Sequence, residues 1–186
     1  MICDKTSACF PNMLNNNTRS CSSSDCLVSR DDRKNIVCKD KRSTTYRLSN
    51  PDGLTAAVVK LDGGVVKNDP RTKCDGAILL GNPGLQPVAV LVELKGNDTP
   101  HAVEQISSAL ELFKATWKGY RKIYGRIVGT KAPWLGSGGD KAYRNLNTAL
   151  ISRGGNLDYQ RPTPVAVDSV QVVDNEIVIP KKKGKK

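Results

Sequence analysis

The sequence predicts an α/β protein in which a mixed central β-sheet is flanked by helices and followed by a C-terminal β-hairpin. Three observations predict this class. Short apolar runs at residues 74–80 and 87–95 have the length and branched side chains of buried strands. The segment from Thr99 to Trp117 repeats apolar residues at helical spacing. Residues 125–129 read as a further strand, and strand, helix and strand in this order build an α/β sandwich.

Composition divides the 186 residues into three parts. Residues 1–41 are rich in Ser, Asn, Asp and Cys and lack a sustained hydrophobic period, so we expect an irregular extension. Residues 42–180 are expected to form the folded domain, which is long enough to bury a sizeable core. Residues 181–186 are a basic tail, which either grips nucleic acid nonspecifically or only solubilises the terminus.

Several short strands are expected before the helix, and together they form an antiparallel meander. A hairpin is expected around Asp62-Gly-Gly, because Asp-Gly is a strong turn signal. The expected strands are, in order, residues 44–48, 55–61, 64–67, 74–80 and 87–95.

The helix is the clearest element, because Thr99-Pro100 supplies a cap and a first-turn proline. Its apolar stripe is interpreted as core and consists of Ala102, Ile106, Ala109, Leu110, Phe113 and Trp117. After it we expect the 125–129 strand beside the Glu93 strand, a flexible loop at 131–139, a second helix at 140–153, and a terminal hairpin at 165–179 turned at Asp174-Asn175.

Strand alternation places charged side chains together at the end of the second apolar run. Residues two apart in a strand share a face, so Glu93 and Lys95 point to the same side. A buried strand that ends in two charges needs counter-charges, a metal or a cleft. Asp75 supplies a second carboxylate at the start of its own apolar run. The alternative is an ordinary salt-bridge cluster at strand ends.

These residue types suit a divalent-metal site that cuts phosphodiesters. A hard cation held by one or two carboxylates stabilises phosphoryl charge and lowers the pKa of a bound water. Asp75 and Glu93 are the natural ligands, and the backbone carbonyl of Leu94 is a candidate uncharged ligand. Lys95 is expected to orient or deprotonate the attacking water, or to neutralise the phosphate.

The ordered set of Asp75, Glu93-Leu-Lys95 and Gln105 resembles the PD-(D/E)XK nucleases, a restriction-endonuclease-like superfamily. The resemblance covers roughly residues 54–128. It implies a restriction-endonuclease-like core, catalytic roles for these residues, and Mg²⁺ or Mn²⁺ as cofactor. It also implies that Gln105 helps to position the lysine or the substrate, and that a homodimer is one arrangement to expect.

Two features depart from the pattern of that superfamily. Cys74 stands where the motif has proline, a position that only supports the aspartate. Many members carry an acidic residue on an earlier helix, whereas this chain has no glutamate before Glu93. Asp62 is the best remaining third carboxylate ligand, although its Asp-Gly context also indicates a turn.

Charge and composition narrow the function further. The formal net charge of +11 indicates a polyanionic partner such as nucleic acid. With His101 as the single histidine, two-histidine zinc sites and paired-histidine ribonucleases are excluded. We expect His101 to be an exposed residue of the first helical turn.

The N-terminus lacks the apolar core of a signal peptide, and no segment has the length of a membrane span, so a cytoplasmic protein without membrane contact is expected. Five of the six cysteines lie in the first 38 residues, at spacings looser than those of typical zinc sites. Their alternatives are ordinary thiols or a structural zinc site.

The sequence therefore predicts a metal-dependent nuclease that hydrolyses phosphodiester bonds, with DNA favoured over RNA by the resemblance. One alternative is an RNase that acts on structured RNA such as tRNA. Another is a basic nucleic-acid-binding or assembly protein that keeps the fold without catalysis.

Overall fold

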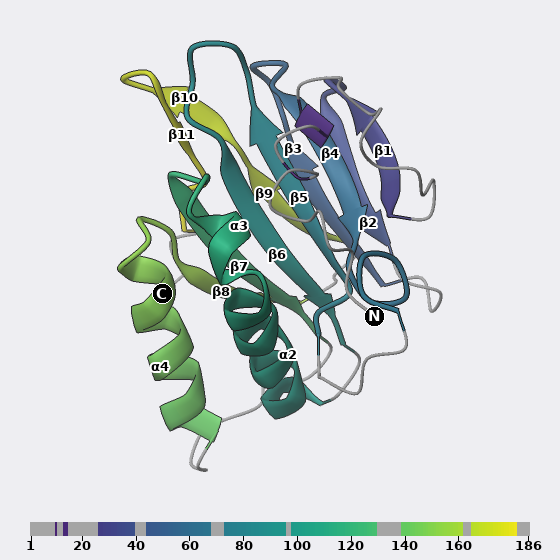
Figure 1. Ribbon diagram of the computed structural model, residues 1–186, viewed down its shortest axis with the longest axis vertical. Helices are drawn as coiled ribbons and strands as arrows, with labels where there is room; N and C mark the ends of the chain where they lie inside the picture. The colour runs from purple at the N-terminus through teal and green to yellow at the C-terminus, as the bar shows by residue number, and fades with distance from the viewer. Residues whose placement is uncertain are drawn as a thin grey trace.

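A six-stranded sheet forms the centre of the protein in the computed structural model (Figure 1), which describes residues 10, 13–14, 26–39, 44–67, 73–95, 98–129, 139–161 and 165–181. Its strands, in spatial order, are β1 (Leu27–Asp31), β4 (Thr55–Lys60), β5 (Gly76–Gly81), β6 (Val88–Leu94), β7 (Lys122–Val128) and β8 (Leu157–Gln160). Strands β1, β4, β5 and β6 are antiparallel in succession, whereas β6, β7 and β8 are parallel. The predicted mixed sheet and its antiparallel meander are present.

Helices cover one face of this sheet. α2 (Thr99–Leu112) and α3 (Lys114–Trp117) connect β6 to β7, and α4 (Gly139–Ile151) connects β7 to β8. Figure 1 shows α2 and α4 lying over the same side of the sheet. The apolar stripe of α2 is buried there, as the sequence predicts, among side chains from β5, β6 and β7. These parallel strands need crossover connections, which the two helices supply.

A smaller sheet, not a helix layer, covers the other face in the described part of the chain. It contains β2 (Asn35–Lys39), β3 (Thr45–Ser49) and β9 (Ala166–Ser169), with β2 antiparallel and β9 parallel to β3. A second apolar core lies between the two sheets. The prediction that helices flank the sheet therefore holds for one face only.

The prediction of an irregular extension over residues 1–41 is wrong for residues 27–39, which form β1 and β2. Ile36 and Cys38 of β2 are buried between the sheets. Phe10 is also buried, and its ring lies 5.7 Å from that of Phe113 and 5.5 Å from that of Trp117. A strand of five residues is too short for its hydrophobic periodicity to stand out in the sequence. Such strands are identified only by the strands with which they pair. Cys3, Cys9 and Cys21 lie outside the described residues.

Two predicted hairpins are also corrected. Residues 64–67 form no strand, because the chain turns after β4 with Gly63 at φ +67°, and β4 pairs with β1 and β5 instead. At the C-terminus the turn at Asp174-Asn175 is confirmed between β10 (Gln171–Val173) and β11 (Glu176–Val178). Of the preceding valines, Val167 belongs to β9, which pairs in parallel with β3 and not with β11, whereas Val172 and Val173 belong to β10. Residues 131–138 of the predicted loop at 131–139 and residues 182–186 of the basic tail lie outside the described residues.

Candidate functional site

The antiparallel register of β5 and β6 brings Asp75 and Glu93 to the same end of neighbouring strands. Gly76 is opposite Val92, so the residues just beyond this pair face each other. The Asp75 amide donates to Glu93 Oε2 at 3.0 Å, and the Leu94 amide donates to Asp75 Oδ2 at 2.8 Å. Each carboxylate is thus fixed by the backbone of the other strand.

Glu93 is fully buried, on the helix-covered side of the sheet. Alternation explains its direction, because Val92 and Leu94 contribute to the core on the opposite face. Lys95 Nζ lies 3.3 Å from Glu93 Oε1, and the lysine side chain is 26% exposed. Apart from this ammonium, Oε1 has no partner among the described residues. A buried carboxylate oxygen with an adjacent cationic side chain and a free acceptor direction is an incomplete polar cluster.

The electrostatics of the cluster favour an additional cation. Burial, followed by the nearby Asp75 carboxylate, raises the pKa of Glu93 to about 8, although Lys95 acts to lower it. Burial and the same two carboxylates also raise the pKa of the Cys74 thiol. Two carboxylates in one poorly solvated place repel, and a bound divalent cation relieves this repulsion.

Glu93→Gln is expected to stabilise the metal-free protein at alkaline pH. Because the folded state raises the pKa of Glu93 from 4.5 to about 8, the unfolded chain releases this proton first. The wild-type stability attributable to this group therefore falls as pH rises between these values. Gln has no proton to lose, so the variant should gain on the order of 5 kcal/mol above the folded pKa and nothing below the unfolded one.

The measurement is urea unfolding of both proteins in a chelator at about pH 4.5, 6 and 9. Glu104→Gln is the matched control, because the Glu104 side chain is 69% exposed. A stability difference between Glu93→Gln and wild type that is the same at all three pH values would contradict the raised pKa.

The donor atoms at this place fit Mg²⁺ or Mn²⁺. Hard divalent cations prefer oxygen ligands, and the cluster offers carboxylate oxygens from Asp75 and Glu93. The amide and carbonyl of one strand residue point toward the same neighbouring strand, and the Leu94 amide is bonded to Asp75. The Leu94 carbonyl therefore points toward Asp75, which agrees with its predicted role as an uncharged metal ligand.

Gln105 joins the site from α2. Its Nε2 donates to the backbone carbonyl of Lys73 at 2.9 Å, which ties the helix to the segment that leads into Asp75. Its Oε1 is buried and has no hydrogen-bond partner among the described residues. The amide is therefore fixed to the backbone two residues before Asp75, with one acceptor available.

Asp62 is not part of this cluster, which corrects its prediction as a third metal ligand. The residue lies in the turn after β4, its side chain is 58% exposed, and its Oδ1 is 3.4 Å from Lys73 Nζ. Within the described ranges, no three Asp, Glu, His or Cys side chains gather as a metal-binding group. The Asp-Gly signal for a turn therefore prevailed over the ligand interpretation.

Two nearby residues complete the description. Lys73, which was not predicted, contacts both Asp62 and Gln105; its position two residues before Asp75 was the available signal. His101 lies in the first turn of α2, as predicted, and its ring is 3.4 Å from Glu104. The cap of α2 is Asp98, one residue before the predicted one, and its carboxylate accepts from the His101 amide.

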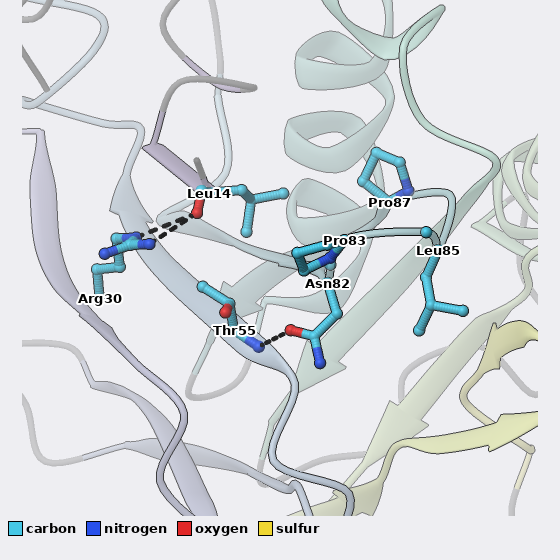
Figure 2. A pocket seen from close by; sticks show the side chains of 9 residues that line it. Leu14, Arg30, Thr55, Asn82, Pro83, Leu85 and Pro87 are labelled. Carbon is cyan, nitrogen blue, oxygen red and sulfur yellow. Dashed lines mark hydrogen bonds between the residues drawn. The ribbon is translucent and has the colours of Figure 1, made fainter. Parts of the chain in front are cut away.

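A surface hollow of about 480 Å³ lies at the opposite end of β5 and β6 (Figure 2). Two of its donor groups are paired within the lining, since the Arg30 guanidinium donates to the Leu14 carbonyl and the Thr55 amide donates to Asn82 Oδ1. Among the described residues, no carboxylate lines it. The hollow therefore offers none of the chemistry found at Glu93.

No protein-family model, curated protein or solved structure matches the chain. The assignment of a function therefore depends on the geometry of this site. No helix in the described ranges is long and apolar enough to cross a membrane.

Proposed function

We propose that the protein is a metal-dependent nuclease whose active site contains Asp75, Glu93 and Lys95. The observation that carries the proposal is the interlocked pair of carboxylates beside the Lys95 ammonium, with a buried Glu93 oxygen that has no other partner among the described residues. An oxygen-rich cluster of this kind is suited to a hard divalent cation and a phosphate.

The order of elements around the site supports a restriction-endonuclease-like core. Asp75 precedes the middle strand of the β4–β5–β6 meander, Glu93 and Lys95 end the third strand, and Gln105 lies on the helix that crosses to the parallel strand β7. This is the arrangement that the resemblance to PD-(D/E)XK nucleases implies. Helices on one face only and the small second sheet are features of this chain.

Asp75, Glu93 and the Leu94 carbonyl would hold the cation, which when bound supplies charge stabilisation at the phosphate and a more acidic water. Lys95 reaches the same place from the end of β6, and its ammonium offsets the negative charge of a phosphodiester. Gln105 has a fixed amide with one available acceptor, which suits it to orient the Lys95 ammonium or a water.

The substrate that fits the molecule is nucleic acid, since a net charge of +11 attracts polyanions. DNA is favoured over RNA by the resemblance alone. The absence of a third carboxylate from the cluster, within the described residues, supports one competing function, a nucleic-acid-binding protein without catalysis.

The proposal predicts cleavage that requires added metal. Purified protein is expected to nick or degrade at least one substrate in a panel of single-stranded, double-stranded and structured DNA and RNA, with Mg²⁺ or Mn²⁺ and not with chelator. Cleavage of structured RNA alone would indicate the RNase alternative. Binding without cleavage of every substrate would instead establish the non-catalytic function.

Metal binding itself is expected to raise the melting temperature. A cation that binds only the folded state at 100 times its dissociation constant adds about 2.7 kcal/mol, which corresponds to several degrees. Mn²⁺ should shift the wild type and leave Asp75→Asn nearly unchanged in differential scanning fluorimetry. Equal shifts in the two proteins would remove Asp75 from the metal site.

A further inference from the structure

The register of the parallel strands aligns Glu93 with a tyrosine two strands away in the sheet. Glu93 is opposite Ile127 in β7, and Ile127 is opposite Tyr159 in β8. Neighbouring strands are about 4.8 Å apart, so the Cα atoms of Glu93 and Tyr159 are separated by about 10 Å. All three side chains face the helix-covered side, where Ile127 is buried and Tyr159 packs against the same core.

Tyr159 is held in place while part of it reaches solvent. Its hydroxyl donates to the Gly129 carbonyl at 2.6 Å, and its side chain is only partly buried. A ring fixed at its hydroxyl and along one side loses little conformational entropy when a planar group packs on it.

Arg161 provides a positive charge beside this ring. It follows β8 directly, is exposed, and lies two residues after Tyr159, as Lys95 lies two residues after Glu93. Burial raises the pKa of the Tyr159 hydroxyl, and the Arg161 charge opposes that rise, so the two groups are close enough to interact.

The carboxyl ends of β6, β7 and β8 therefore lie level with one another along one edge of the sheet. Lys95 donates its amide to the Val128 carbonyl, and Gly129 donates its amide to the Gln160 carbonyl, so the three chains stay in register up to this edge. Gly129 lies between Lys95 and Arg161 along this edge, so no side chain separates the two cations. Ligands of α/β sheets commonly bind at the carboxyl ends of parallel strands.

We propose that Tyr159 and Arg161 form a nucleotide subsite next to the carboxylate cluster, in which Tyr159 stacks on a base and Arg161 contacts a phosphate. Base stacking on aromatic rings is tolerant of sequence, and an arginine beside the ring secures the backbone. A separation of about 10 Å spans about three stacked nucleotides, at a rise of about 3.4 Å each. This subsite rests on the proposed nuclease function and gives Tyr159 and Arg161 a binding role, not a catalytic one.

The test compares binding and turnover of fluorescein-labelled single-stranded oligonucleotides of about 12 nucleotides, a length within the usual range for such sites. Ca²⁺ replaces Mn²⁺ in the binding measurement. Tyr159→Leu removes the aromatic ring and keeps an apolar side chain, and Tyr159→Phe keeps the ring and removes the hydroxyl. Arg161→Gln removes one exposed charge. Arg153→Gln is its matched control, since Arg153 follows α4 at the opposite end of β8.

Tyr159→Leu is expected to weaken binding about 5- to 100-fold, with KM raised and kcat changed little, whereas Tyr159→Phe stays near wild type. An abasic nucleotide at the stacked position should remove the difference between Tyr159→Leu and wild type. Arg161→Gln should lower the slope of log Kd against log salt by about one phosphate contact, and Arg153→Gln should not.

Different results separate this subsite from the proposed function. A wild type that binds and cuts, with Tyr159→Leu and Arg161→Gln both unchanged in Kd and KM, would overturn the subsite and leave the nuclease proposal standing. A wild type that neither binds nor cuts any substrate would overturn both. Because Arg161 is exposed, Arg161→Gln still decides the question if Tyr159→Leu unfolds.

Discussion

Replacing Glu93 or Lys95 by alanine is expected to abolish metal-dependent cleavage of nucleic acid and to leave binding largely intact. Glu93 supplies one of the two carboxylates, and its Oε2 accepts the Asp75 amide. Lys95 is the cation whose Nζ lies 3.3 Å from the Glu93 carboxylate. Loss of groups that merely support a metal ligand costs about 10- to 100-fold, so loss of either residue should cost at least about 100-fold in kcat/KM.

The experiment measures initial rates of cleavage with Mn²⁺ and, in parallel, affinity with Ca²⁺ by fluorescence anisotropy. Glu93→Gln and Lys95→Met serve beside the alanine variants, because they keep side-chain volume while removing the charge. Lys118→Ala is the matched control, since Lys118 is exposed at the end of α3. Cleavage by Glu93→Ala or Lys95→Ala at the wild-type rate would remove the site assignment.

Sequence patterns predicted the elements whose signal is local. Residues 88–92 are a continuous stretch of apolar side chains because β6 is buried on both faces, between the helix layer and the small sheet. The stripe of α2 repeats at helical spacing because one side of the helix packs on the sheet. In both cases the pattern of apolar residues within one segment is enough to indicate which of its faces are buried.

The small sheet escaped prediction because its signal is not local. β9 is four residues long and pairs in parallel with β3, about 120 residues earlier in the chain. Val167 and the valines on either side of β9 instead favoured a hairpin with the next apolar segment, because a sequence pattern indicates pairing between neighbouring segments first. β8 was also missed, since its Leu-Asp-Tyr-Gln alternation is too short to stand out beside the long runs.

The residues of the candidate site also divide into those with a local sequence signal and those without one. Asp75, Glu93 and Lys95 were predicted because strand alternation and neighbouring apolar runs fix their direction, and their mutual contacts follow from the register of β5 and β6. Asp62 was wrongly included because it was chosen as the best remaining carboxylate and not for the direction of its side chain. Tyr159 was missed because its relation to Glu93 passes through β7 and needs the order of the sheet.

A second large effect is expected at Asp168, whose replacement by alanine should destabilise the protein by about 3–5 kcal/mol. Asp168 lies on β9, and its side chain is almost completely buried between the two sheets. It accepts hydrogen bonds from Arg126 Nε of β7, from the Tyr46 hydroxyl of β3 at 2.9 Å, and from Gln160 Nε2 of β8 at 2.7 Å. One carboxylate therefore links four strands of two sheets.

The cost arises chiefly from what alanine leaves behind. Arg126 is fully buried, and without Asp168 its guanidinium retains backbone carbonyls and the Asn156 amide oxygen as acceptors, with Asp158 as a nearby negative charge. A poorly compensated charge in the interior is costly, the Tyr46 hydroxyl also loses its acceptor, and Gln160 Nε2 keeps a 3.4 Å hydrogen bond to Asp158. Since a domain of this size is stable by only about 5–15 kcal/mol, Asp168→Ala should approach the limit of folding.

Urea unfolding at neutral pH measures the effect, with Glu176→Gln as control, because Glu176 is an exposed acid of the same C-terminal region that pairs with Arg121 and Lys122. That control should be much less destabilised, since exposed ion pairs contribute little. The double variant Arg126→Met/Asp168→Leu should recover part of the loss, because removing both charges leaves neither unpaired. If Asp168→Ala unfolds at the same urea concentration as Glu176→Gln, the buried pair does not hold the small sheet to the large one.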